Sequence, residues 1–387
     1  MDVIISLKKT LLRSQNDETK DCFRSCIRGY YINNHDKNVS IKEQINNCLM
    51  NTQSYPPETE FELPPLEKKD KGIIEIRNES TLRAAYRLVV EEKKKEVCAL
   101  NFANGFHPGG GVIYNANAQE ETLCRSSALY CSLIEKNDFY DYHIAEDTNL
   151  ASNYLIFSPS CPTWKIDNYE KLDQPFLVSY ITSAAVHNHD VQSREQIREI
   201  HDKRIKAILE CAIENGVKNI ILGAFGCGAF RNNPEDIAGS FKHWLIDENL
   251  KDYFETISFS IIERKDSRNI DAFSNVFNLS IIETEKYQPN KEQQEDKHIQ
   301  DNKQQEEHKK NNEQKQRRIS TQKPSQHHPV DSSSSYEYSE YDYYSEYSDY
   351  DEYSDYDNYS DYNDNDDYSN YWDYYYHYYM NYYFYNI

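Results

Sequence analysis

Short apolar runs alternate with longer amphipathic runs between residues 96 and 263, and this alternation limits the folds that the chain can adopt. The strand-like runs are Glu96–Asn104, Tyr154–Ser158, Phe176–Thr182, Asn219–Phe225 and Thr256–Glu263, and the helix-like runs are Ala118–Lys136, Ser193–Asn215 and Asn233–Asp247. Strands separated by helices of this length indicate an α/β fold with a largely parallel central sheet. Ligands of such sheets bind beyond the carboxyl ends of the strands, so the loops that follow the strands are candidate sites.

The flanking segments differ from this central region in composition. Residues 1–68 contain two amphipathic stretches, Ser6–Tyr31 and Ser40–Met50, and end in a proline-rich connector, so we expect an N-terminal helical extension. Residues 69–284 then form the globular core, which contains the alternating runs. Residues 285–387 pass into a Tyr/Asp/Ser-rich repeat with too few aliphatic side chains to offset the entropy of ordering, which predicts a disordered tail.

The distribution of charge excludes several classes of partner. The net charge is −22, but Lys323 is the last Lys or Arg, so the tail carries most of that charge and the globular part is only mildly acidic. Phosphate contacts need clustered Lys and Arg, and we therefore expect no general nucleic-acid surface.

The nine scattered cysteines indicate reduced thiols without a metal site. No run approaches the ~20 apolar residues of a membrane span, which favours a soluble, intracellular and monomeric protein.

The run Gly109-Gly110-Gly111 lies shortly before Gln119-Glu120-Glu121 and is the most informative motif. Three glycines permit close backbone approach and positive φ angles. Two neighbouring glutamates crowd negative charge, so one of them can keep a proton near neutral pH. The pattern favours cleavage of a glycosidic bond beside a phosphate. The alternative is a surface turn that leads into an acidic first helical turn.

A second glycine loop, Gly226-Cys227-Gly228-Ala229-Phe230, follows another strand-like run. Each of the two loops leads into a helix, so backbone amides and a helix N-terminus could receive an anion without Lys or Arg. Gly-Cys-Gly alone is weak evidence. Together with the first loop it suggests a site shaped for a diphosphate.

These two motifs closely resemble those of the microbial-type poly(ADP-ribose) glycohydrolases. The similar stretches run from Leu100 through the glycines and glutamates to Tyr130, and again from Leu222 to Asn232, and the resemblance spans most of residues 10–265. It implies a macrodomain-like three-layer core and a hydrolase that releases ADP-ribose from poly(ADP-ribose) or ADP-ribosylated protein without a cofactor.

The resemblance also implies roles for individual residues. Glu121 is the expected catalytic acid, and Glu120 is expected to bind the ribose hydroxyl at the scissile linkage. The expected substrate-binding residues are Asn104, Gly109, Gly110, Gly111, Gln119, Gly226, Cys227, Gly228, Ala229 and Phe230.

Other interpretations of the same residues stay open at this point. Asn104 could cap a turn, Phe230 could be a core aromatic residue, and Cys227 could suggest a nucleophile. His187 stands where the family has a proline-rich turn, and with His189 and Asp190 it is more typical of a solvated loop. An ADP-ribose-binding module without activity needs the glycine loops but no general acid. A hydrolase of mono-ADP-ribosylated protein or nucleic acid would differ only in how the site is covered.

Overall fold

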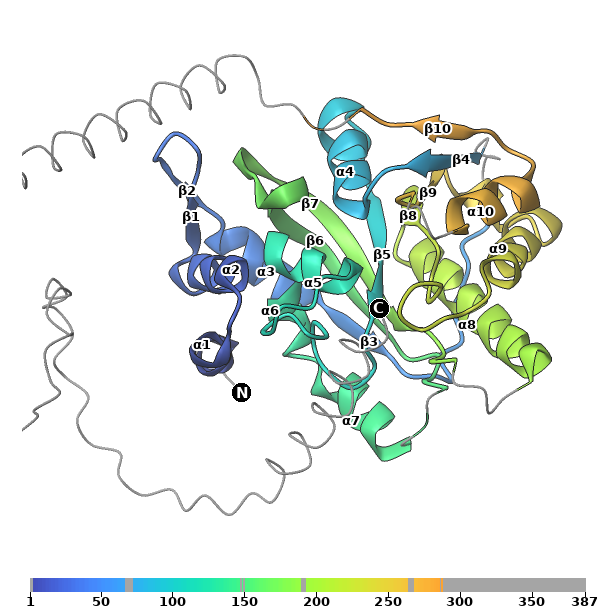
Figure 1. Ribbon diagram of the computed structural model, residues 1–387, viewed down its shortest axis with the longest axis horizontal. Coiled ribbons are helices and arrows are strands. Elements are labelled where there is room, and N and C mark those ends of the chain that lie inside the picture. The colour runs from blue at the N-terminus through green and yellow to red at the C-terminus, as the bar shows by residue number, and fades with distance from the viewer. Residues whose placement is uncertain are drawn as a thin grey trace, which may run out of the picture. The chain divides into compact units, whose positions relative to one another are not determined.

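The computed structural model describes residues 3–66, 72–146, 148, 150–188, 193–263, 268–285 and 287 (Figure 1). The chain divides into two compact units, Met1–Lys310 and Asn311–Ile387, and all described residues belong to the first. The predicted disordered tail, residues 285–387, lies outside the described residues except for Glu285 and Tyr287.

The first unit is built on an eight-stranded mixed sheet with the order β10-β4-β9-β8-β5-β7-β6-β3. Its strands are β3 (Gln53–Tyr55), β4 (Ile73–Asn78), β5 (Val97–Ala103), β6 (Leu155–Lys165), β7 (Lys171–Ala184), β8 (Asn219–Leu222), β9 (Thr256–Ser260) and β10 (Ile281–Glu283). Neighbouring strands from β10 to β7 are parallel, and β6 and β3 are added antiparallel. The prediction of an α/β fold with a largely parallel sheet is therefore confirmed.

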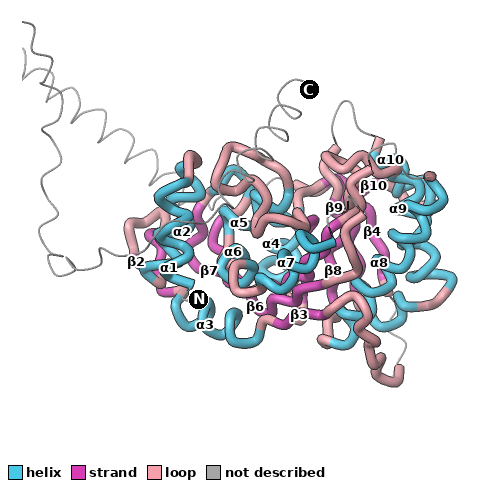
Figure 2. Tube along the Cα trace, turned by 90° about the horizontal axis from the view of Figure 1, so that it is seen from below, coloured by secondary structure: helices cyan, strands magenta, loops and turns pink. Residues whose placement is uncertain are grey.

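Helices cover both faces of the sheet and give the three predicted layers (Figures 1 and 2). They are α1 (Val3–Arg13), α2 (Asp17–Arg28), α3 (Lys42–Asn51), α4 (Thr81–Tyr86), α5 (Gln119–Ser126), α6 (Leu129–Leu133), α7 (Asn137–Glu146), α8 (Arg194–Glu214), α9 (Pro234–Lys242) and α10 (Asn269–Phe277). Alternate residues of β5 show the layering: Val97 and Ala99 pack with α2 to α7, whereas Cys98 and Leu100 pack with α8, α9 and α10. No helix in the described ranges is both long and apolar enough to cross a membrane.

The N-terminal segment is less uniformly helical than the sequence predicts. The predicted stretch Ser6–Tyr31 is broken, because Asn16 caps α2 by accepting a hydrogen bond from the Thr19 amide at 3.0 Å. The hairpin of β1 (Tyr30–Ile32) and β2 (Asn38–Ser40) follows, and β3 joins the main sheet beside β6. The segment therefore packs as part of the catalytic unit.

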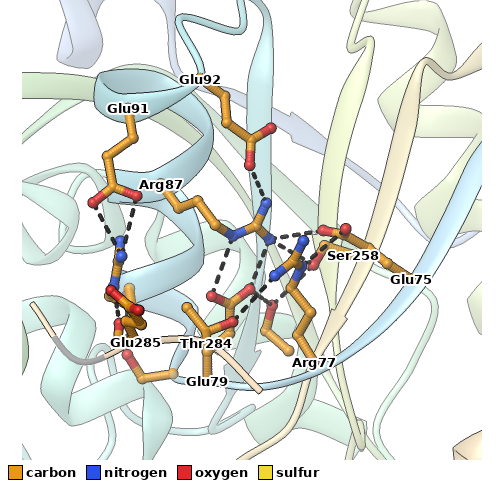
Figure 3. A network of polar contacts seen from close by, with 12 residues as sticks. Glu75, Arg77, Glu79, Arg87, Glu91, Glu92, Ser258, Thr284 and Glu285 are labelled. Carbon is orange, nitrogen blue, oxygen red and sulfur yellow. Dashed lines mark hydrogen bonds and ion pairs between the residues drawn. The ribbon is translucent and has the colours of Figure 1, made fainter. Parts of the chain in front are cut away.

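Strand β4 was not predicted from the sequence, because charged residues interrupt its apolar pattern. Those charges are partly buried in a polar network around Arg87, which lies in the π-helical segment η1 (Arg87–Glu91) (Figure 3). The guanidinium group of Arg87 contacts Glu75 and Glu79 at 2.7 Å each and Glu92 at 2.6 Å. Paired charges of this kind can be buried in a sheet layer, whereas unpaired charges cannot.

The same network holds the last described residues, including two beyond the predicted boundary at residue 284. Arg77 donates to the Thr284 hydroxyl at 3.4 Å, and Arg83 donates to the Glu285 carbonyl at 2.9 Å. The ring of Tyr287 meets that of Tyr86 edge to face at 5.2 Å. Strand β10 and the residues after it therefore close one edge of the catalytic unit.

Two truncations separate this edge from the tail. A chain ending after Asn290 should keep the melting temperature of the full chain, since it retains β10 and the contacts of Glu285 and Tyr287. A chain ending after Ser280 loses all of them and should melt roughly 5–10 °C lower, as expected for a loss of about 2–3 kcal/mol. Thermal unfolding of both chains measures the difference. A large loss in the chain ending at 290 would show that the tail folds onto the catalytic unit.

Candidate active site

Three loops meet at one edge of the sheet because they follow three adjacent parallel strands, β8, β5 and β7. The loop after β7 is tied to the loop after β8, since the Asn188 amide donates to the Phe230 carbonyl at 3.0 Å and the Asn232 side chain donates to the Val186 carbonyl at 2.7 Å. The two predicted glycine loops follow β5 and β8. Their expected proximity is confirmed by the pairing of those strands.

Glu120 lies at the start of α5, 3% exposed, between donors from β5 and the loop after it. The Asn104 amide donates to its Oε2 at 2.8 Å, and the Asn101 side chain donates to its Oε1 at 3.3 Å. Burial and then the charge of Glu121 raise the pKa of Glu120 well above its usual range, against the lowering effect of these donors and the Gly109 amide. The carboxyl of Glu120 is thus poised to hold a proton.

Glu121 is 7% exposed and links the two ends of the loop between Gly111 and α5. The Gly111 amide donates to its Oε1 at 2.9 Å, and the Ala118 amide donates to its Oε2 at 3.1 Å. The second bond is the usual return of a helix N3 side chain to the N-cap amide. Both oxygens of Glu121 are therefore fixed by backbone groups, which keeps its side chain in one orientation.

The glycine triplet brings backbone close to these carboxyl groups. Gly109 and Gly110 have φ angles of 68° and 56°, in the left-handed region that favours glycine. A Cβ at Gly110 would lie 2.6 Å from Oε1 of Glu121 and 3.1 Å from Oε2 of Glu120. The amides of Gly109, Gly110 and Gly111 donate to Glu120, to the His107 carbonyl and to Glu121, respectively. The amides of Gly109 and Gly111 thus serve the carboxyl pair, and none of the three points outward as a ready anion donor.

Two other predicted substrate residues also have internal partners. The Asn104 side chain accepts from the amides of Phe106 and His107 at 2.8 and 3.0 Å, so it caps the turn after β5, as the alternative interpretation has it. The Gln119 amide group donates to the Leu100 carbonyl at 2.7 Å and accepts from the Phe102 amide at 2.9 Å. Gln119 thereby fastens the start of α5 to β5, and this places the glutamates.

The second glycine loop has a tight turn and an open tip. Gly226 has a φ of 71°, and a Cβ there would lie 2.5 Å from the Asn232 side chain. Gly228 and Ala229 are exposed, and a Cβ at Gly228 meets no described atom within 4 Å. The N-terminus of α9 is capped by Asn233, which accepts from the Asp236 amide at 2.9 Å. Asn233 thus satisfies one amide of this helix end, and the tip of the loop before it is open.

Cys227, Phe230 and His187 pack around this loop. Burial raises the pKa of the Cys227 thiol, which argues against a nucleophile. The half-buried ring of Phe230 lies 4.9 Å from the ring of His187, which is only 8% exposed. The solvated-loop interpretation of His187 is thus wrong. Hydrogen bonds hold the two loops together, and the His187 ring packs against Phe230 between them. His189 and Asp190 lie outside the described residues.

Sequence reasoning missed the residues that hold the site together. Asn101 is buried on β5 and bridges Glu120 and Thr182. Arg125 is 1% exposed and stands one helical turn after Glu121 on α5, so its position in the motif was visible although its contacts were not. Within the described part of the chain no group of three or more His, Cys, Asp or Glu side chains could hold a metal ion.

The three-layer fold with a buried glutamate pair at the carboxyl edge of its sheet defines a macrodomain-like α/β protein. Residues 19–166 match the family model of the microbial-type poly(ADP-ribose) glycohydrolase (PARG) catalytic domain. The crystal structure of PARG from Thermomonospora curvata is similar with a TM-score of 0.63 at 30% identity, over 67% of this chain and 98% of that chain. The chain belongs to the microbial-type PARG family.

Related structures carry ligands. The Thermomonospora curvata enzyme bound to the inhibitor ADP-HPD is similar with a TM-score of 0.61 at 31% identity, over 67% of this chain and 97% of that one. PARG from Deinococcus radiodurans in complex with ADP-ribose is similar with a TM-score of 0.53 at 29% identity, over 60% of this chain and 96% of that one. No curated protein sequence matches the chain.

The environment of Glu120 predicts a pH-dependent gain in stability for Glu120→Gln. The pKa of Glu120 in the folded protein exceeds its ordinary value of 4.5, so above pH 4.5 the unfolded chain loses a proton that the folded protein keeps. The contribution of this proton to the free energy of unfolding is fully present below pH 4.5. As the pH rises towards the folded pKa, the free energy of unfolding of the parent falls by about 1.4 kcal/mol per pH unit. Glutamine does not ionise, so Glu120→Gln does not lose this stability as the pH rises.

Denaturant unfolding at pH 5, 6, 7 and 8 measures this gain. The advantage of Glu120→Gln over the parent should grow with pH, and the exposed Glu248→Gln should show no trend. Asn101 can adapt to glutamine by turning its amide, since its Oδ1 has no hydrogen-bond partner among the described residues. An advantage that is the same at all four pH values would contradict the raised pKa.

Proposed function

We propose that this protein hydrolyses the ribose–ribose O-glycosidic bonds of poly(ADP-ribose) and releases ADP-ribose, with Glu121 as the general acid and base. Membership of the microbial-type PARG family supports the activity, as do the related enzymes with ADP-ribose or ADP-HPD bound. The observation that carries the proposal is the buried pair of Glu120 and Glu121, oriented by amides of the glycine loop. A protein that only binds ADP-ribose has no use for such a pair.

The reaction needs one proton for the departing ribose oxygen and one water for the anomeric carbon. Protonated Glu121 donates to that oxygen as the glycosidic C–O bond breaks, and the ribose left behind passes through an oxocarbenium-like state. The resulting carboxylate of Glu121 then takes a proton from the incoming water, whose oxygen bonds to the anomeric carbon and restores the acid. Because Glu121 is fixed at both oxygens, it can serve both steps without reorienting.

Glu120 positions the substrate in this proposal. Its carboxyl is held by the Asn104 amide and by Asn101, so it can meet a ribose hydroxyl in a fixed direction. Burial and the charge of Glu121 raise the pKa of Glu120 well above its usual range, so Glu120 can meet that hydroxyl in its protonated form.

The remaining predicted residues shape the substrate site. We assign the exposed tip at Gly228 and Ala229, with Gly226 and Cys227, to the diphosphate, and Phe230 to the ribose beside it. Gly109, Gly110 and Gly111 form the wall next to the glutamates. The half-buried side chain of Asn104 and the α5 start held by Gln119 complete the ribose end. These residues supply backbone and aromatic contacts, and the step requires no cofactor.

The proposed substrate is poly(ADP-ribose) or an ADP-ribosylated protein. We expect a monomer, because the catalytic pair and both loops come from one chain. The mildly acidic catalytic unit offers no basis for general nucleic-acid binding.

Replacing the proposed acid gives the direct test. Glu121→Gln should lower the rate of ADP-ribose release from poly(ADP-ribose) by ~10²–10⁴, the usual contribution of a general acid and base. Glutamine keeps the acceptor for the Gly111 amide, so ADP-ribose affinity by calorimetry should change by no more than about tenfold. The exposed Glu135→Gln provides the matched control and should keep parental activity.

The outcomes separate the competing functions. Equal turnover of Glu121→Gln and the parent would remove Glu121 from the mechanism. A parent that binds ADP-ribose but releases none from the polymer would be a reader. A parent that acts only on mono-ADP-ribosylated protein would show that the polymer is not the substrate.

A further inference from the structure

The loop between Gly111 and α5 is held from outside by a side chain that the proposed mechanism does not use. Tyr169 lies at the tip of the hairpin between β6 and β7, and its hydroxyl donates to the Asn117 side chain at 3.2 Å. The same hydroxyl accepts from Nη1 of Arg125 at 3.3 Å. Tyr169 thus joins the hairpin to both the catalytic helix and the loop before it.

The backbone at this tip is strained. Asn168 and Tyr169 both have a φ of 58°, the pattern of a type I′ hairpin turn, whose second central position is normally glycine. A bulky residue with a left-handed φ is an outlier that persists only where the surrounding structure compensates. The chain keeps tyrosine at a glycine position, where its hydroxyl makes these contacts and its ring lies 5.9 Å from Nζ of Lys165.

Arg125 gives those contacts a rigid base. It is 1% exposed, and its Nη2 donates to the carbonyls of Val112 and Tyr114 at 3.0 Å each. Its Nε donates to the Thr19 hydroxyl at 2.9 Å, and that hydroxyl donates to the Val112 carbonyl at 2.6 Å. The first half of the loop is therefore fixed by Arg125 and α2, and Tyr169 fixes the second half through Asn117.

Asn117 precedes Ala118, whose amide donates to Oε2 of Glu121 at 3.1 Å. A displacement of Asn117 therefore moves the donor that orients the proposed acid. We propose that Tyr169 is a positioning residue for the hydrolysis, which acts by clamping Asn117 and, through Ala118, Glu121. Its catalytic consequence rests on the proposed function, whereas the clamp itself does not.

Two variants of Tyr169 separate this role from a purely structural one. Tyr169→Phe removes only the hydroxyl, and Tyr169→Gly also relaxes the turn. Both should lower kcat by about tenfold with KM within about twofold, as a small misplacement of a catalytic group does. The melting temperature should fall by no more than about 2 °C for Tyr169→Phe and should not fall for Tyr169→Gly. Tyr154→Phe, which loses a 2.7 Å hydroxyl bond to Asp138, is the matched control and should keep its kcat.

Hydrogen exchange tests the clamp without reference to activity. Amides of residues 115–118 should exchange about tenfold faster in Tyr169→Phe than in the parent and at the parental rate in Tyr154→Phe. Adding Asn117→Ala to Tyr169→Phe should lower kcat no further than the stronger single change.

Parental kcat in Tyr169→Phe, or an equal loss in Tyr154→Phe, would overturn the positioning role. Unchanged exchange of residues 115–118 would overturn the clamp. If the parent released no ADP-ribose, the proposed function would fail, and the exchange measurement would still decide the clamp.

Discussion

Hydrogen bonds from the glycine-loop backbone to two buried carboxyl groups are the interactions on which the site depends. Glu120 and Glu121 are almost inaccessible to water, and carboxyl groups buried in this way need donors. Apart from the Asn101 side chain, the donors are main-chain amides, from Asn104 to Glu120 and from Gly111 and Ala118 to Glu121. A Cβ at Gly110 would lie 2.6 Å from Oε1 of Glu121, so the loop backbone can pass this close to the carboxyl groups only because that residue is glycine.

The N-terminal segment contributes to the same arrangement, although it is remote in sequence. The Gln15 amide donates to the Ile113 carbonyl at 2.8 Å, and the Thr19 hydroxyl reaches both Val112 and Arg125. The segment thus supports the loop through hydrogen bonds to its backbone and to Arg125. This explains why it packs against the catalytic unit and contributes β3 to its sheet, where a separate helical domain would do neither.

The sequence predicted those parts of the molecule that local pattern determines. The parallel strands at the centre of the sheet are buried on both faces and therefore appear as apolar runs, and the glutamates appear in the helical motif that follows the glycines. Strand β4 was missed because Glu75 and Arg77 interrupt its pattern, and their partner Arg87 is identified only by the fold.

The roles of residues whose partners are distant in the sequence were harder to predict. Asn101 resembles any polar residue in a strand until β5 and α5 come together, and Tyr169 lies in a hairpin more than forty residues after the motif. The sequence led us to predict that the amides of the glycine triplet face a diphosphate. A sequence cannot show where these amides point, because the direction of an amide depends on the conformation of the turn. The structure directs those amides to the glutamates and to His107.

Hydrolysis of poly(ADP-ribose) by Gly110→Ala, compared with Gly216→Ala, tests most directly whether glycine backbone holds the catalytic pair. Both glycines have left-handed φ angles, 56° and 72°, so alanine should destabilise each by about 1 kcal/mol. Only at Gly110 would the new methyl meet the carboxyl groups, whereas at Gly216 it meets no described atom within 4 Å. The account predicts that Gly110→Ala loses at least about a hundredfold in kcat/KM while Gly216→Ala stays near the parent. Equal activity of the two variants would contradict it.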